Sequence, residues 1–84
     1  MSVQEIIRTH SKNDTFKYQL LSRMKQDCEY YLGYGNRSEK VLWSGTVKEH
    51  IADMKELHNS FDDRFKPEWL TMEDIEEYER KMKA

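Results

Sequence analysis

Residues 27–45, DCEYYLGYGNRSEKVLWSG, hold most of the chain's unusual side chains and decide how it folds. They include the only cysteine, all three glycines, three of the five tyrosines and one of the two tryptophans. An apolar periodic segment precedes this stretch and another follows it, and glycine and asparagine tolerate the backbone of tight reversals. We therefore expect a corner between two helices here.

An amphipathic helix is predicted over residues 15–32, which lead into the corner. Its apolar residues recur at the three- and four-residue spacing of one helix face: Leu20, Leu21, Met24, Cys28, Tyr31 and Leu32. Gly33 follows the last of them and fits the left-handed position that ends many helices. Gly35 and Asn36 add two residues that tolerate positive φ.

Three further helical segments are expected after the corner. Residues 38–43 predict a short helical turn that returns Leu42 or Trp43 to the preceding helix. Thr46-x-x-Glu49 is a capping box before an apolar stripe that runs to about Ser60. Thr71 caps a last helix, with Asp74 at its third position. The apolar positions of that helix are Met72, Ile75, Tyr78 and Met82.

A short N-terminal helix that ends near Thr9 is predicted, because Ser2 and Glu5 form another capping box. Residues 10–13 are polar and break the pattern, and Asn13 or Asp14 then caps the long helix. No strand-like alternation occurs. The fold class is therefore all-α: a small helical bundle of three main helices plus one or two short ones. We expect residues 1–13 to form a short helix with a linker and residues 14–84 to form the helical domain.

Composition is consistent with one small soluble domain. The 84 residues are 37% apolar and 36% charged, with a net charge of −2, so the chain lacks the strong positive charge typical of nucleic-acid-binding domains. Residues 68–79 carry six acids and no Lys or Arg, which favours a basic partner or simple solubility. A single cysteine forms no internal disulfide, and no apolar run reaches signal-peptide or membrane-span length. A cytoplasmic protein without membrane contact is expected.

The residue types for catalysis or metal binding are present but poorly spaced. Cys28 would need His10, His50 or His58 as a base or as a fellow zinc ligand, yet there is no C-x-x-C or H-x-x-x-H pair. Cys28 also lies on the apolar stripe, where a free cysteine usually behaves as a small buried side chain. We expect no catalytic residue, no metal and no cofactor.

Asp27 borders the apolar face, where a carboxylate needs partners to offset desolvation. Candidate partners are Arg23, the backbone or Arg37 side chain of the turn at residues 33–37, and the Trp43 indole N–H. A structural role is predicted for Asp27, in preference to a catalytic one. The other residues predicted to be structural are Gly33, Gly35, Trp43, Pro67 and Trp69.

The corner also holds the chain's aromatic and basic cluster. We expect Tyr31 and Trp43 to point into the core and the rest to form an exposed patch: Tyr30, Tyr34, Asn36, Arg37 and Lys40. With so few cations, a protein partner is favoured over nucleic acid.

Longer strings in the sequence resemble a known family. LLSRM and DCEYYLG before the corner, MKELHNS after it, and KPEWLTMEDIEEYERKM near the end resemble large polyvalent protein-associated domain 11, from about Tyr18 to Met82. That family occurs in large proteins of phages and conjugative elements and as small stand-alone chains. The resemblance implies accessory roles in a bacterial host, such as counter-defence or DNA processing, and it implies no catalytic residues.

Two hypotheses follow. In the first, the chain is a non-enzymatic protein-binding module of a mobile element that inhibits a host defence protein. Its binding residues would be Tyr34, Asn36, Arg37 and Lys40 at the corner, with Glu73, Glu76 and Glu77 on the last helix. The alternative is a nucleic-acid-binding accessory for DNA transfer or replication that uses Arg23 with the corner. The sequence leaves open which face binds and the oligomeric state.

Overall fold

The computed structural model describes residues 3–9 and 14–83. The elements follow in the order α1 (Val3–Thr9), α2 (Asp14–Leu32), a 3-10 helix η1 (Glu39–Val41), α3 (Val47–Asn59) and α4 (Met72–Lys83). No strand occurs in these two ranges. The all-α prediction of three main helices with one or two short ones is confirmed. The predicted roles of Ser2, His10 and Asn13 lie outside the described residues.

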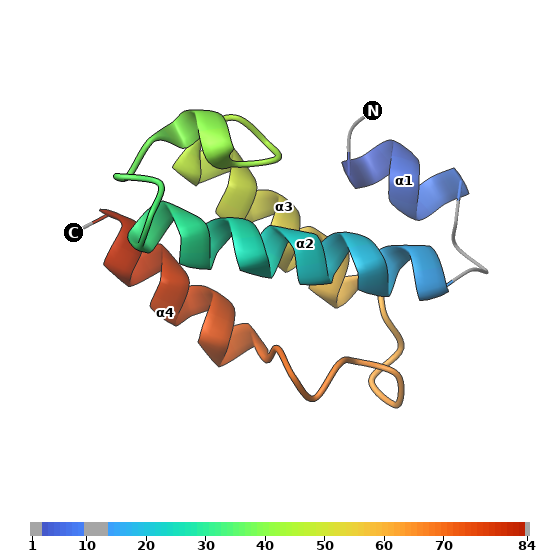
Figure 1. Ribbon diagram of the computed structural model, residues 1–84. Coiled ribbons are helices and arrows are strands. Elements are labelled where there is room, and N and C mark those ends of the chain that lie inside the picture. Colours follow the sequence, from blue (N-terminus) through green and yellow to red (C-terminus); the bar gives the residue numbers. More distant parts are fainter. Residues whose placement is uncertain (1–2, 10–13, 84) are drawn as a thin grey trace.

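Helix α2 is the long axis around which the other elements pack (Figure 1). It contacts α3, α4 and η1, while α3 also packs against α4 and α1. Figure 1 shows α3 behind α2, α4 beneath it and η1 above its C-terminal end. The resulting body measures 36 × 25 × 17 Å. Each end of α4 therefore lies next to a segment that connects two helices, and one of these segments carries the candidate site.

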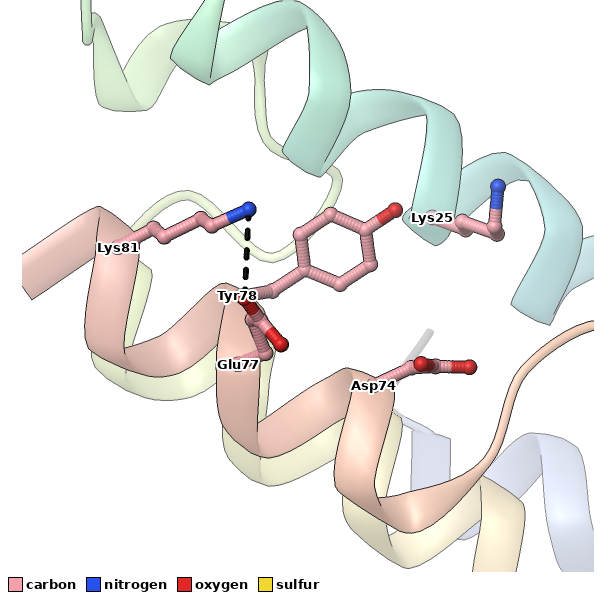
Figure 2. A pocket seen from close by; sticks show the side chains of 5 residues that line it. All are labelled: Lys25, Asp74, Glu77, Tyr78 and Lys81. Atoms are coloured by element: carbon pink, nitrogen blue, oxygen red, sulfur yellow. Dashed lines mark ion pairs between the residues drawn. The ribbon is translucent and has the colours of Figure 1, made fainter.

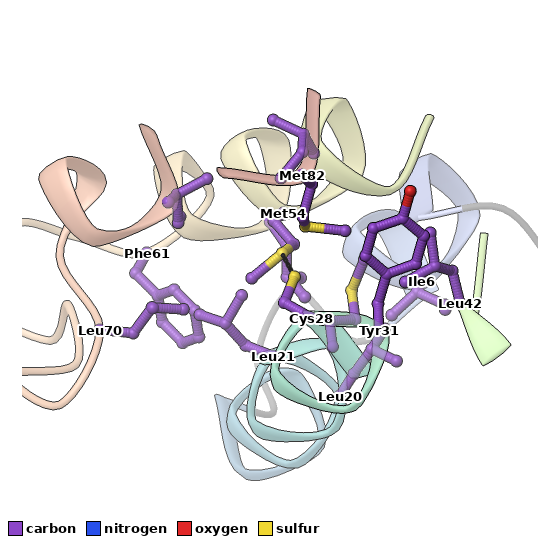
Figure 3. Close-up of a cluster of buried hydrophobic side chains, with 14 residues drawn as sticks. Ile6, Leu20, Leu21, Cys28, Tyr31, Leu42, Met54, Phe61, Leu70 and Met82 are labelled. Atoms are coloured by element: carbon purple, nitrogen blue, oxygen red, sulfur yellow. Dashed lines mark hydrogen bonds between the residues drawn. The ribbon is translucent and has the colours of Figure 1, made fainter. Parts of the chain in front are cut away.

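A single apolar cluster joins all the helices (Figure 3). Every predicted stripe contributes to it, and the helix connections add Leu42, Phe61 and Leu70. The buried apolar residues of the four helices are Ile6, Leu20, Leu21, Met24, Cys28, Tyr31, Ile51, Met54, Leu57, Ile75 and Met82. Because Leu42 is in the core, the prediction that the 38–43 turn folds back onto α2 is confirmed.

Two of the predicted caps are present. Thr46 Oγ1 accepts from the Glu49 backbone N–H at 3.1 Å. At α4, Thr71 Oγ1 accepts from the Asp74 N–H (3.1 Å), and Asp74 Oδ2 accepts from the Thr71 N–H (3.0 Å). Each bond satisfies an N–H group that has no partner inside its helix.

The turn after α2 differs from prediction in its backbone. Asn36 and Arg37 are left-handed, with φ of 52° and 58°, whereas Gly33 and Gly35 are not. The prediction of a left-handed Gly33 is wrong, because its N–H still donates to the carbonyl four residues earlier at 3.0 Å. Gly35 is required for a different reason, because Tyr30 leaves no space for a Cβ atom at this position. A Cβ there would lie 2.9 Å from the Tyr30 carbonyl oxygen and 3.0 Å from Tyr30 Cδ1.

Candidate functional site

The corner between α2 and α3 is held by two carboxylates that receive hydrogen bonds from the turn. Asp27 Oδ2 accepts from the Trp43 backbone N–H at 3.1 Å, so Asp27 does meet Trp43, but through the backbone in place of the predicted indole. Asp53 Oδ2 accepts from the Ser44 hydroxyl at 2.7 Å. The Trp43 side chain packs against the core. The turn after η1 is therefore pinned to both α2 and α3.

Arg37 ties the other side of the corner to the end of α4. Its Nη2 donates to the Lys81 carbonyl (3.1 Å) and its Nη1 to the Met82 carbonyl (3.4 Å). The last carbonyls of a helix have no partner within the helix, and a cation there also meets the negative end of the helix dipole. Arg37, predicted to bind a partner, therefore caps α4 in this structure. These two hydrogen bonds hold the Arg37 backbone in the left-handed conformation, which costs a non-glycine residue about 1–2 kcal/mol.

Two tyrosines stand on the outer side of this braced corner. The Tyr34 side chain is 89% exposed and that of Tyr30 is 50% exposed, whereas Tyr31 is buried as predicted. The Tyr30 ring lies against the Gly35 backbone, so it is positioned by the turn. Asn36 and Lys40 are also exposed. Tyr30, Tyr34, Asn36 and Lys40 are thus exposed on the end of α2, the turn after it and η1, and they are called the corner surface below.

The acidic residues of α4 separate into two groups. Glu77 is paired, with its Oε1 3.2 Å from Arg80 Nη2 and 3.5 Å from Lys81 Nζ. Glu73 and Glu76 are exposed and form no ion pair within residues 3–9 and 14–83. Unpaired negative charge thus lies in the first half of α4, whereas Arg37 and the corner adjoin the last turn.

A shallow hollow of about 350 Å³ runs between α2 and α4 (Figure 2). Tyr78 lies at its centre and donates to Glu29 Oε1 at 3.0 Å, and Lys25 donates to the same oxygen at 2.6 Å. The hydrogen bond from Lys25 is the main cause of the lowered pKa of Glu29, and the bond from Tyr78 is the second. Burial, and then the bond to Glu29, raises the pKa of Tyr78. The groups that line the hollow already form hydrogen bonds or ion pairs within the domain, so the hollow is a seam between α2 and α4.

The comparison with family models matches residues 14–82 to large polyvalent protein-associated domain 11. This chain belongs to that family. The match begins at the first residue of α2 and ends in the last turn of α4, so α1 lies outside it. No curated protein and no solved structure matches the chain.

Three of the side chains considered above for catalysis, Cys28, His50 and His58, are buried in the family domain. Cys28 is fully buried, with its Sγ 3.5 Å from Met54 Sδ. Burial, aided by the nearby Asp27 and Glu29, raises the pKa of the Cys28 thiol to about 12. At neutral pH the thiolate needed for nucleophilic attack is therefore scarce. His50 and His58 are buried on α3 and bond to backbone carbonyls instead of to Cys28.

Within residues 3–9 and 14–83, no group of three or more His, Cys, Asp or Glu side chains is arranged to hold a metal ion. Over the same ranges, no helix combines the length and apolar character needed to cross a bilayer.

The segment between α3 and α4 contains the last two predicted structural residues. Pro67 is buried. Trp69 is 45% exposed, whereas the next residue, Leu70, is fully buried. Trp69 is thus a surface aromatic of the domain, and Leu70 is the side chain that anchors this segment to the core.

Lys17 and Tyr18, which the apolar spacing did not single out, attach this segment to the start of α2. Lys17 is only 3% exposed, and its Nζ lies 3.5 Å from the Ser60 carbonyl oxygen and 4.6 Å from the centre of the Phe61 ring. The Tyr18 ring stacks on Phe61 at 4.6 Å, and its hydroxyl donates to the Phe65 carbonyl. A signal existed, because Lys17 precedes Leu21 by four residues and extends the buried stripe.

Proposed function

We propose that this domain is a non-enzymatic protein-binding module of a mobile genetic element such as a phage or conjugative element. The observation that supports this most is the exposure of Tyr34, 89%, at a corner braced by Asp27 and Arg37. Tyrosine is enriched among the residues that dominate protein interfaces. A braced turn also loses little conformational freedom when a partner binds, which lowers the cost of association.

The charges near the corner favour a protein partner over nucleic acid. Arg37 donates to helix carbonyls, and Arg80 and Lys81 pair with Glu77. Lys83 pairs with Glu79 at 3.1 Å. Binding driven by phosphate contacts needs cations that are free to displace counterions. The cations beside Tyr34 are mostly engaged within the domain, so aromatic contact is the better-supported source of affinity.

Within this class, we favour an inhibitor of a host defence protein in the cytoplasm of a bacterial cell. Polyvalent proteins of mobile elements resemble cargo that helps the element survive in a new host, which supports such a role. Glu73 and Glu76 would face a basic groove of the host protein while Tyr34 anchors the contact. They lie five to eight residues from Lys81 along α4, about 7–12 Å at 1.5 Å per residue, so one partner can reach both.

The test compares two exposed aromatic residues at different ends of the molecule. Wild type, Tyr34→Ala and Phe65→Ala are used to capture proteins from a host lysate, and the captured partner is purified and titrated calorimetrically. Phe65 is 51% exposed and serves as the matched control. We expect Tyr34→Ala to weaken binding by at least tenfold, about 1.4 kcal/mol. Phe65→Ala should bind like wild type, and both variants should keep the wild-type melting temperature.

The remaining outcomes separate the versions of the proposal. Equal affinity of Tyr34→Ala and wild type would rule out the corner surface. Equal affinity of a Glu73→Lys, Glu76→Lys variant would rule out the acidic contact alone. Gel shifts with single-stranded DNA at low salt test the alternative. A shift that is lost in an Arg23→Ala, Lys40→Ala variant would favour a nucleic-acid-binding accessory instead.

A further inference from the structure

Two histidines fasten α3 to its neighbours at two points. His50 is 0% exposed and His58 is 4% exposed. His50 Nε2 lies 3.0 Å from the Met24 carbonyl oxygen of α2, and His58 Nε2 lies 3.1 Å from the Leu70 carbonyl oxygen just before α4. A carbonyl oxygen only accepts, so in both rings Nε2 carries the hydrogen and donates it.

The second nitrogen of each ring is left without a partner. Nδ1 of His50 and Nδ1 of His58 are buried and form no hydrogen bond with the described residues. In the neutral ring this nitrogen is an acceptor with an unused lone pair. Protonation would turn it into an N–H donor on a buried cation, and an unpaired buried charge is far more costly than an unpaired acceptor.

The charges around His50 do not remove this cost. Burial lowers the pKa of His50, although the bond to Met24 and the carboxylates of Asp27 on α2 and Asp53 on α3 act in the opposite direction. Both carboxylates already accept hydrogen bonds from the turn at residues 43–44. Neither carboxylate forms a hydrogen bond with His50 Nδ1, so neither gives an added proton a partner.

The surroundings of His58 also disfavour a proton. Burial lowers its pKa, and Lys66 in the segment between α3 and α4 lowers it further, against the effect of the Leu70 carbonyl. Helix α4 contributes Ile75 and Met82 to the core as its buried side chains. The Glu5 and Arg8 side chains of α1 are exposed.

We propose that His50 and His58 form a proton-sensitive double latch. Acid favours the open chain, in which water solvates a protonated ring, over the folded core, in which a proton at Nδ1 finds no partner among the described residues. As the pH falls, α3 therefore loses its attachment to α2 at one point and to the start of α4 at the other. The two rings are about two turns apart on one helix, so release at both points opens the core between the three main helices. The latch is independent of the partner proposed above.

The direction of the pH effect on stability, and the pH range in which it acts, follow from the difference between the folded and unfolded pKa values of the two histidines. An unfolded histidine titrates near pH 6.5, and both folded pKa values are lower, so the unfolded chain binds more protons as the pH falls below about 6.5. Stability is complete above that pH and is lost as acid is added. Glu29 and Glu79 also have lowered pKa values, but from the ordinary glutamate value of 4.5, so their effect begins at lower pH.

Urea unfolding at pH 7.5 and 5.5 tests the latch, with glutamine as a non-titrating replacement that keeps an N–H donor. For wild type we expect the unfolding constant to rise by up to about 100-fold between the two pH values, because each histidine contributes at most about tenfold. His50→Gln and His58→Gln should each show a rise of at most about tenfold, and the double variant almost none. His10 is unchanged in every variant, so differences between the variants report on His50 and His58 alone. A wild-type constant that changes less than about threefold, or a double variant as acid-sensitive as wild type, would falsify the latch.

Wild type alone gives a second test in case a variant does not fold. Nitrogen-15 NMR of the histidine rings should show the Nε2–H tautomer for His50 and His58, with no titration of either ring in the folded protein above pH 5.5. If both rings titrate near pH 6.5 while the domain remains folded, the latch does not exist.

Discussion

At the scale of single residues, Asp27 shows how one carboxylate sets the corner. It is half-buried on α2, and its Oδ2 receives the Trp43 N–H from the turn after η1. A backbone N–H that loses its acceptor in a partly buried place carries the cost of its lost hydration. Asp27 therefore determines where the η1 turn rests, and with it the position of Lys40.

Replacement of Asp27 tests this contact. We expect Asp27→Ala to destabilise the domain by about 1–3 kcal/mol, because the Trp43 N–H loses its acceptor. In a domain of this size, each kcal/mol corresponds to about 4–8 °C in melting temperature. Asp27→Asn is the control, because an amide oxygen still accepts the bond and should retain most of the stability. An unchanged melting temperature for Asp27→Ala would contradict a structural role.

At the scale of helices, α4 depends on caps at both of its ends. Thr71 and Asp74 exchange hydrogen bonds at its start, and Arg37 donates to carbonyls in its last turn. Lys55 of α3 also donates to Glu79 at 3.1 Å. A twelve-residue helix is too short to be stable by itself in water. Its persistence therefore relies on the caps and on the packing of Ile75 and Met82.

The N-terminal cap of α4 can be tested by removing one hydroxyl. Thr71→Ala should cost about 1 kcal/mol in urea unfolding, because the Asp74 N–H loses its acceptor. Thr71→Ser keeps the hydroxyl and should lie within a few tenths of a kcal/mol of wild type. Equal stability of the alanine and serine variants would show that the capping box contributes nothing.

At the scale of the whole molecule, one core joins every helix, so the domain is expected to unfold as one unit. Cys28 lies fully buried in that core, with a pKa raised to about 12. A buried and protonated thiol does not react with an aqueous reagent until the surrounding helices separate. The rate of thiol modification therefore reports on opening of the whole core.

Labelling of Cys28 with an aromatic disulfide at pH 8 makes this measurable. For a small domain with a stability of about 3–5 kcal/mol, labelling should be about 10²- to 4 × 10³-fold slower than in urea-unfolded protein. The rate should rise with added urea in parallel with the loss of helical circular dichroism. Fast labelling of the native protein would indicate local access to Cys28 instead of global opening.

Most of the fold was predictable because its signals are local. Apolar spacing located the three long helices, and Thr46 and Thr71 marked the starts of two of them. The error at Gly33 has a different origin. A glycine after a helix predicts a left-handed end, but here the helical bonding continues through Gly33 and the reversal falls on Asn36 and Arg37. Gly35 is explained by the Tyr30 ring, a contact that the spacing of residues does not reveal.

The candidate site was predictable only in part. Exposure of Tyr34 followed from its place between two glycines, outside any apolar stripe. The capping of α4 by Arg37 could not be predicted, because this contact joins residues 44 positions apart in the chain. The pairing of Glu77 with Arg80 and Lys81 was within reach of the three- and four-residue spacing on one helix.

The division between the two kinds of information has a physical reason. Helix positions, caps and the family strings around the corner depend on neighbours within about one helical turn, so they can be read along the chain. The roles of Arg37, Lys17 and the two buried histidines depend on which carbonyls are brought within hydrogen-bond distance of them. Those carbonyls belong to other segments, and only the packing of α2, α3 and α4 around one core brings them there.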